Sequence, residues 1–293
     1  MIENRKSQRR YKVFQIVILL IIILLLSACV RREDEKENSQ KGFEYTVLDT
    51  GKSDCMIILM DDIVIVNDVG DYDDYDDYSH LKKTLDGKGI KKIDYVVISH
   101  FDKDHMGGAR QLIIDYDVEK VYVPDYVIDA NRYEELKRAV NDRGTKWNIL
   151  NKNETIKFQK GQMRLFAAHK TFYEDENDYS IVSLFEYEGS SILAMGDAKK
   201  ERIEEFAEDY ENECKDICID MIKIPHHGDY NKPLEHILEI TNAKYGIITC
   251  DKTKETVSKK LIRGANEIGC ELIFSSDGDF VARFDNGEIQ IKQ

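Results

Sequence analysis

The stretch that decides the fold is His100-Phe101-Asp102-Lys103-Asp104-His105, which directly follows the apolar run Ile93–Ser99. A short apolar run rich in β-branched residues indicates a buried strand. Alternate side chains of an extended loop point to one side, so the first, third and fifth residues of the stretch could converge while the sixth points elsewhere. Histidine and aspartate are suitable ligands for zinc, manganese or iron. Four such residues within six positions therefore favour two neighbouring metal sites over a polar surface loop.

Two later clusters also stand at the ends of strand-like runs. Asp197 follows Ser191–Met195 and Gly196, where a carboxylate could bridge two metal ions. His226 and His227 follow the run Cys218–Ile224. A lone His-His pair is usually structural, but three strand-end clusters rich in ligand types are far more specific together than any one alone. The sequence therefore predicts one shared site to which all three clusters contribute.

From residue 43 onward, strand-like runs alternate with polar turns and helical patterns. The expected strands are Phe43–Leu48, Cys55–Met60, Ile63–Val66, Ile93–Ser99, Lys120–Val123, Lys157–Phe158, Met163–Ala167, Ile181–Tyr187, Ser191–Met195, Cys218–Ile224, Tyr245–Thr249, Leu272–Phe274, Phe280–Phe284 and Ile289–Ile291. The expected helices are Ser79–Leu85, Met106–Tyr116, Arg132–Arg143, Lys199–Asp209, Leu234–Thr241 and Thr256–Gly269. Strands in two blocks with interspersed helices suit a layered α/β sandwich.

Six motifs in order resemble the metallo-β-lactamase superfamily and, within it, the extracytoplasmic domain of ComEC-type competence proteins. They are Val47–Cys55, Asp68–Gly70, Ser99–Gly108, Asn177–Val182, Met195–Ala198 and Lys223–Gly228. The resemblance implies an α/β fold of the four-layer αββα sandwich type, with a metal site at one edge. It also implies that the chain is a metal-dependent hydrolase.

The resemblance carries a ligand set over to this chain, which would hold two divalent metal ions. The ligands would be His100, Asp102, Asp104, His105, Asp197 and one or both of His226 and His227. Asp68 would orient the ligand loop from behind. Asp104 or Asp197 would orient the attacking hydroxide that two metals generate by lowering the pKa of a shared water.

This chain departs from the superfamily pattern in two places. Asp102 stands where the usual loop has a histidine, so the ligand set is richer in oxygen and manganese rivals zinc, the first choice. No residue clearly matches the third-motif histidine; His169 lies near that region and is equally well a surface histidine. His80 and His236 fall on expected helices, where surface roles are expected.

The charge of the chain bears on its substrate. The formal net charge is −14, and residues 1–28 hold five basic residues against Glu3, so the body is even more acidic. Such a body is a poor match for a nucleic-acid backbone, and no extended nucleic-acid-binding face is expected. A phosphodiesterase or nuclease-like enzyme for a small-molecule or phosphodiester substrate is the first hypothesis. The alternatives are an ester, thioester or lactam hydrolase of the same fold and a non-catalytic binding lipoprotein.

The first 42 residues predict that the chain is exported from the cytoplasm. A basic start, the apolar run Val13–Leu26 and Ser27-Ala28 form the layout of a bacterial export signal over residues 1–28. Leu26–Cys29 resembles the lipobox of bacterial lipoproteins, which implies cleavage before Cys29 and its acylation; an uncleaved signal anchor is the alternative. Residues 29–42 are expected to be a polar tether and residues 43–293 the hydrolase domain, anchored by lipid to the extracytoplasmic face of the cell membrane.

The segment Asp71–Tyr78 contains alternating acids and tyrosines after the Asp68 turn. It is expected near the mouth of the site, either as a lid that binds a cation or repels polyanions, or as a solvated acidic loop, the favoured interpretation. Besides Cys29, five cysteines remain, an odd number that cannot pair fully. We therefore expect buried or free thiols.

Overall fold

The computed structural model describes residues 42–71, 77–253, 257–285 and 288–293, and residues 43–293 form one compact unit. The predicted signal of residues 1–28, the acylation site Cys29 and the tether up to residue 41 lie outside the described residues, as does most of the acidic segment, residues 72–76. Among the helices described, none is both long and apolar enough to cross a membrane.

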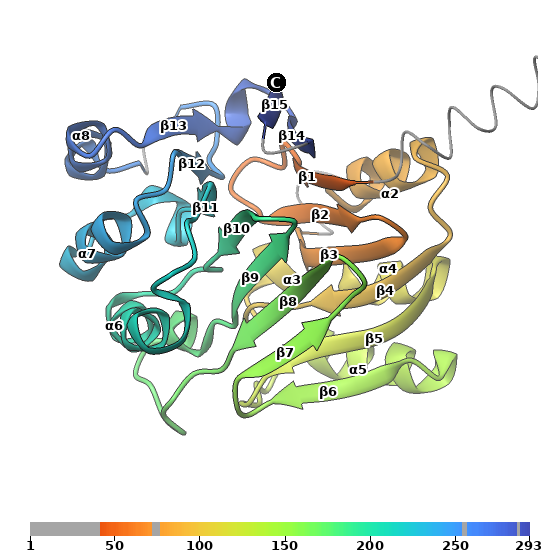
Figure 1. Cartoon of the computed structure of the whole chain (residues 1–293). Coiled ribbons are helices and arrows are strands. Elements are labelled where there is room, and N and C mark those ends of the chain that lie inside the picture. Colours follow the sequence, from red (N-terminus) through yellow and green to blue (C-terminus); the bar gives the residue numbers. More distant parts are fainter. Residues whose placement is uncertain (1–41, 72–76, 254–256, 286–287) are drawn as a thin grey trace, which may run out of the picture. The chain divides into compact units, whose positions relative to one another are not determined.

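The first sheet has eight strands in the order β15-β14-β1-β2-β3-β4-β5-β6. Neighbours from β15 to β3 are antiparallel, and those from β3 to β6 are parallel. The strands are β1 (Phe43–Val47), β2 (Cys55–Met60), β3 (Ile63–Val69), β4 (Lys92–Val97), β5 (Asp117–Pro124), β6 (Lys146–Leu150), β14 (Phe280–Asp285) and β15 (Glu288–Lys292). Its outer face carries α2 (Asp77–Gly87), α3 (Lys103–Met106), α4 (Ala109–Asp115) and α5 (Asn131–Arg143) (Figure 1).

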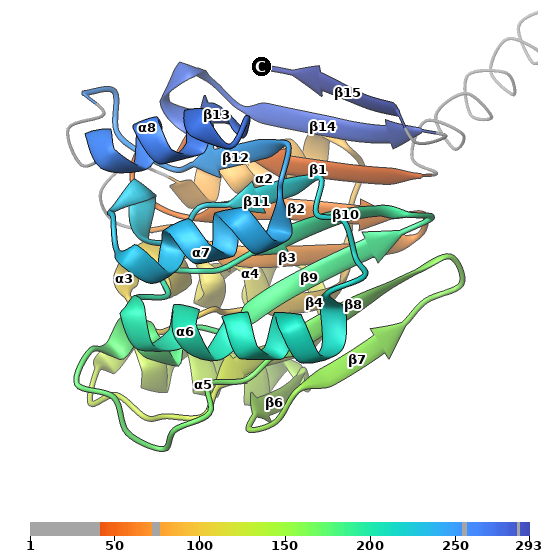
Figure 2. The ribbon, with the colours of Figure 1, turned by 60° about the vertical axis from the view of Figure 1, so that its left-hand side comes forward.

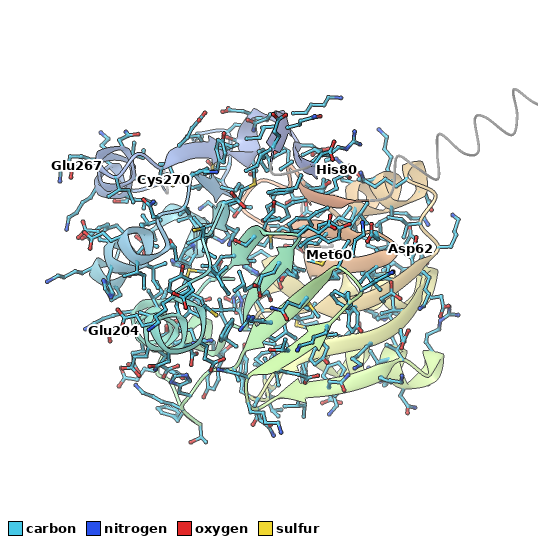
Figure 3. The ribbon with its side chains drawn as sticks, in the orientation of Figure 1. Met60, Asp62, His80, Glu204, Glu267 and Cys270 are labelled. Atoms are coloured by element: carbon cyan, nitrogen blue, oxygen red, sulfur yellow. The ribbon has the colours of Figure 1, made fainter. Side chains whose placement is uncertain are left out.

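The second sheet has seven strands in the order β13-β12-β11-β10-β9-β8-β7, with β10 to β13 parallel. The strands are β7 (Glu154–Lys157), β8 (Gly161–Phe166), β9 (Val182–Tyr187), β10 (Ser190–Ala194), β11 (Met221–Lys223), β12 (Tyr245–Ile248) and β13 (Glu271–Phe274). Helices α6 (Lys200–Asp209), α7 (Lys232–Thr241) and α8 (Lys259–Glu267) cover its outer face (Figure 2). Figure 3 labels Glu204 and Glu267 on the outward sides of α6 and α8.

Alternation along β2 shows how the layers are held together. Its side chains are all buried, because Cys55, Ile57 and Leu59 pack under the helices of the first sheet while Met56, Ile58 and Met60 pack against the second sheet. Successive residues of a strand point to opposite faces, so one strand serves two cores. Full burial of such a side chain stabilises the fold by roughly 1.5–3 kcal/mol. A third core lies between the second sheet and its helices, which confirms the predicted four-layer αββα sandwich.

Several predicted elements need correction. The edge strand β6 was not predicted, because only the last of its five residues is buried and its sequence lacks a clear alternation. The expected helix Met106–Tyr116 is two helices, α3 and α4, and α3 already begins at Lys103. The expected strand Cys218–Ile224 is only three residues long as β11. The last two corrections matter because the segments concerned lie directly beside the candidate ligands.

Candidate metal centre

The candidate ligands meet where parallel strands of both sheets end. β4 leads to His100, β10 leads to Asp197, and β11 leads to His226 and His227. Parallel strands present their carboxyl ends at one edge of a sheet, and the two sheets are packed face to face, so these loops converge. This is the shared site that the sequence predicts.

Asp104, His105, Asp197 and His227 offer ligand atoms that all lie within 4.8 Å of one another. His227 Nε2 is 3.1 Å from Asp197 Oδ2 and 3.4 Å from Asp104 Oδ2, and His105 Nε2 is 3.3 Å from Asp197 Oδ1. Two imidazoles and two carboxylates suit zinc or manganese. We call these four residues the closed group.

The presence of His105 in the closed group corrects the prediction of an alternating extended loop. Asp102 has extended dihedral angles, φ −66° and ψ 151°, but the helical turn of α3 starts at the next residue. The helical turn brings Asp104 and the adjacent His105 into the same group of ligands. The sequence argument therefore had the wrong local geometry, although the structure does bring the candidate ligands Asp104 and His105 together.

His100 and Asp102 form a second, smaller pair. His100 Nε2 is 3.5 Å from Asp102 Oδ2, and the ring of His100 lies 4.2 Å from that of His105. Among the described residues, the fully buried Nε2 atoms of both histidines make no hydrogen bond. Burying a polar nitrogen without a partner is costly, so these atoms suit ligation of a cation. We call His100 and Asp102 the open pair, because the Asp102 side chain is 41% exposed.

Comparison with known proteins agrees with this geometry. The family model of the metallo-beta-lactamase superfamily matches residues 48–250.

The chain belongs to the metallo-beta-lactamase superfamily.

Three relatives show how far the likeness extends. ComE operon protein 3 of Bacillus subtilis (strain 168) is 25% identical over 57% of this chain and 21% of the relative. Recombination protein 2 of Haemophilus influenzae is 24% identical over 73% of this chain and 25% of the relative. The solved structure of Tm1679, a metal-dependent hydrolase of the beta-lactamase superfamily, matches with a TM-score of 0.54 at 12% identity, over 81% of this chain and 98% of that one. The chain thus spans about a quarter or less of the curated relatives' length, and it is a metallo-β-lactamase-fold hydrolase with a candidate metal site.

The two adjacent histidines of this metallo-β-lactamase-fold chain occupy different surroundings. His227 is part of the closed group, whereas His226 lies outside both groups of candidate ligands, with Nδ1 3.5 Å from Asp229 Oδ2. Both have positive φ angles, 48° and 53°. Left-handed backbone costs about 1 kcal/mol or more for a residue with a Cβ, and such strain clusters at functional sites. This strain marks the turn as functional, and the contacts of His227 Nε2 with Asp104 and Asp197 make His227 the candidate ligand.

His169, the weak candidate for a third-motif ligand, points elsewhere. Its Nε2 lies 3.0 Å from Asp209 Oδ2 at the end of α6, and its backbone N–H donates to Glu205. Neither group of clustered candidate ligands among the described residues includes it. His80 and His236 likewise pair with carboxylates away from the site, Asp279 and Glu211.

Asp68 lies behind His105, as the resemblance implies. Its Oδ2 is 3.0 Å from His105 Nδ1, while Ser99 donates to its carboxylate from both the backbone N–H, at 2.7 Å, and the hydroxyl, at 2.8 Å. A carboxylate bonded to the far nitrogen of an imidazole fixes the orientation of the ring and its tautomer. Asp68 thereby leaves His105 Nε2 facing the other three residues of the closed group.

Three further residues support the site, and their roles were not predicted from the sequence. Lys223 is completely buried, forms an ion pair with Asp54, lies 3.3 Å from Asp197 Oδ1 and donates to Gly196 O at 2.9 Å. Thr249 Oγ1 is 2.6 Å from Asp54 Oδ1 and 3.1 Å from His227 Nδ1. Asp54 and Lys223 stand inside two of the quoted motifs, but only the fold reveals that they meet.

Charge is tightly balanced in this centre. Burial alone would raise the pKa of Asp197, but His105, His227 and Lys223 hold it well below the usual range. Burial alone would lower the pKa of His227, but Asp197 and Asp104 raise it to about 9. The centre therefore pairs carboxylates with protonated histidine, and binding of a cation there would be coupled to release of those protons.

Proposed function

We propose that this chain is a metal-dependent phosphodiesterase tethered by a lipid anchor to the outer face of the cytoplasmic membrane. The observation that carries the proposal is the closed group, in which four ligand atoms lie within 4.8 Å, three of them on side chains at most 10% exposed. The open pair adjoins it through the contact of the His100 and His105 rings. Together they provide donors for two divalent ions, zinc first and manganese as its rival.

The donor set fits divalent cations, because the Nε2 atoms of His100 and His105 lack hydrogen bonds within the described residues and the carboxylate of Asp197 is held ionised. Divalent ions bound there supply Lewis-acid activation of water and neutralise the charge that develops on the attacked group.

Asp104 and Asp197 are the residues proposed to act on the attacking water. Burial would raise the pKa of Asp104, but the hydrogen bond from His227 and the charge of His105 lower it to about 2. A carboxylate with so low a pKa is a weak general base at neutral pH, because efficient proton transfer needs a pKa near the working pH. Its role is therefore to accept a hydrogen bond and hold the water in line. Lys223 keeps Asp197 in place from the opposite side.

The phosphodiester class rests on the motifs shared with ComEC-type proteins and on the oxygen-rich ligand set. The names of the two curated relatives, ComE operon protein 3 and Recombination protein 2, agree with a competence-related role, although the chain spans a quarter or less of each. The lipid anchor rests on Leu26–Cys29. Cys29→Ser should abolish labelling with a clickable fatty acid, and unchanged labelling would refute the anchor.

The decisive experiment measures metal content and turnover together. The full chain is purified in detergent, its zinc and manganese are counted by elemental analysis, and hydrolysis of bis-p-nitrophenyl phosphate is followed with and without a chelator. We expect chelator-sensitive turnover that Asp197→Asn removes and His169→Ala, the matched control outside the site, leaves intact. Turnover of an ester, thioester or lactam in its place would support the alternative hydrolases, and absence of bound metal would support a non-catalytic binding protein.

A further inference from the structure

We propose that the groove between α4 and α5 binds a linear polyol-phosphate polymer through its phosphates and guides it to the metal centre. This inference rests on the proposed function, because it names the substrate class of the same site. Figures 1 and 2 both show α4 and α5 side by side on the outer face of the first sheet.

The groove consists of two adjoining cavities, of about 430 Å³ and about 310 Å³. Lys103, Arg110 and Arg132 line the first, and Arg110, Arg138 and Arg143 line the second. Arg110 and Glu135 line both cavities, so the two adjoin, and we call them together the channel. From Arg132 to Arg143 the channel runs along α5 for about 16 Å, at about 1.5 Å per residue.

The channel starts at the ligand loop. Lys103 stands between the candidate ligands Asp102 and Asp104, and it lines the first cavity together with Arg110. Arg132 donates from Nε and Nη2 to the carbonyl of Phe101, at 3.3 and 3.1 Å. A polymer bound in the channel therefore reaches the loop that carries the metal ligands.

The charge of the channel is opposite to that of the chain. Five basic side chains line it against three acidic ones, Asp71, Glu135 and Asp142, whereas the whole chain has a formal net charge of −14. Lys103 lies 3.1 Å from Asp71, and Arg110 lies 3.9 Å from Glu135. Within the described residues, no carboxylate lies within ion-pair distance of the other three arginines, Arg132, Arg138 and Arg143. Arg138 and Arg143 thus remain for bidentate binding of phosphates, and Arg132, whose Nε and Nη2 donate to the Phe101 carbonyl, adds its positive charge.

The channel favours a sparsely charged polymer over a nucleic acid. A DNA duplex carries one charge per about 1.7 Å, and a body this acidic repels it outside the narrow channel. Single strands gain affinity by stacking bases on aromatic rings, and the described lining contains no aromatic side chain. The lining does contain the amides of Gln111 and Asn131, which suit polyol hydroxyls.

Binding of fluorescent poly(glycerol phosphate) to the full chain, in detergent and with a chelator present, tests the channel without catalysis. Three phosphate contacts predict a slope of log K against log salt of about −2. Replacing Arg132, Arg138 and Arg143 by glutamine should weaken binding at least roughly tenfold and bring the slope near zero. Arg263→Gln, which removes one positive charge from α8, is the control and should change neither.

A gain-of-binding variant keeps the test sound if the triple variant folds poorly. Glu135→Gln with Asp142→Asn removes two acids from the channel and should tighten binding and steepen the slope. The inference would be overturned if the slope of log K against log salt were unchanged in both channel variants. It would also be overturned if Arg263→Gln lost as much binding affinity as the triple variant. Tighter, channel-dependent binding of oligothymidine of equal charge would overturn the choice of polymer. Because the assay contains a chelator, loss of phosphodiester hydrolysis alone would count against the proposed function and leave the channel standing.

Discussion

The closed group and the open pair lie side by side in one centre, but they are built differently. Three of the closed group's four side chains are at most 10% exposed, and Asp54, Asp68, Lys223 and Thr249, all buried, hold them from behind. The open pair has two side chains, one of them 41% exposed, and only Ser99 Oγ, 3.1 Å from His100 Nδ1, lies behind it among the contacts described.

In this centre, the group with more ligand side chains is also the group that buried residues hold in place. A cation in the closed group replaces protons within a cage that is already formed, so little ordering is needed on binding. A cation at the open pair must order Asp102 and take the remaining ligands from water or substrate. We therefore predict unequal affinities, with one ion retained through purification and a second that exchanges readily.

The largest expected effect is the loss of the closed group. Removing partners behind a ligand already costs 10–100-fold in metal affinity, so His227→Ala, which removes a ligand, should cost more than roughly 100-fold. Isothermal titration with zinc and with manganese measures this loss, and circular dichroism checks the fold. Retention of the tight ion in His227→Ala, with the same affinity as in His169→Ala, would show that the closed group is not the metal site.

Loss of the buried ion pair between Lys223 and Asp54 should give the next largest effect. Burial alone lowers the pKa of Lys223, but Asp54 and Asp197 raise it, so the lysine stays charged. Lys223→Met leaves Asp54 buried without its partner and should cost about 3–5 kcal/mol of stability. It should also weaken metal binding about 10–100-fold by releasing Asp197.

A double variant separates these two consequences. Lys223→Met with Asp54→Leu removes both charges and should recover most of the stability, measured by urea unfolding of the metal-free protein. Metal affinity should stay low, because Asp197 and His227 have still lost their supports. Full recovery of metal affinity in the double variant would assign the pair to stability alone.

The open pair should show a smaller effect. His100→Ala should abolish the second, weaker equivalent of metal and leave the affinity of the first within roughly threefold. Elemental analysis after dialysis and a titration at higher metal concentration measure the two equivalents separately. If both equivalents disappear together, the two positions are one cooperative site and the contrast drawn above is wrong.

Much of the fold was predictable from the sequence, because buried strands and amphipathic helices carry strong periodic patterns. Cys55–Met60 was expected and found with the same limits. The edge strand β6 was missed, because four of its five residues are not fully buried and its pairing with β5 decides its conformation. Long-range pairing of this kind leaves little mark on a single sequence.

The site was predictable in its residues but not in its geometry. Strand ends rich in histidine and aspartate identified the closed group, including Asp197, which lies 92 positions after His105. Choosing between His226 and His227 required the contacts of His227 Nε2 with Asp104 and Asp197. The roles of Lys223 and Thr249 required the contact of each with Asp54, more than 150 positions away. Contacts between distant segments are set by the fold, so no local pattern reveals them.

The smallest expected effect concerns a histidine–carboxylate pair far from any candidate ligand group. The hydrogen bond that His80 donates to Asp279 raises the pKa of His80 despite partial burial. Because the folded pKa lies above the unfolded value, this pair stabilises the protein fully below about pH 6.5, and the gain is lost as the pH rises through the raised pKa. Both side chains are about a third exposed, so screening limits the gain to under about 1 kcal/mol.

Thermal unfolding of the chelated protein from pH 5.5 to 9 measures this gain as the difference between the unmodified chain and His80→Gln. Titrations shared by the two proteins, including those of the metal centre, cancel in the difference. Asp279→Asn should give the same loss below pH 6.5, because either change removes the pair. A difference that does not vary with pH would mean that His80 contributes packing without charge. In that case one neighbouring carboxylate would not be enough to raise the pKa of His80, whereas several carboxylates surround His105 and raise its pKa.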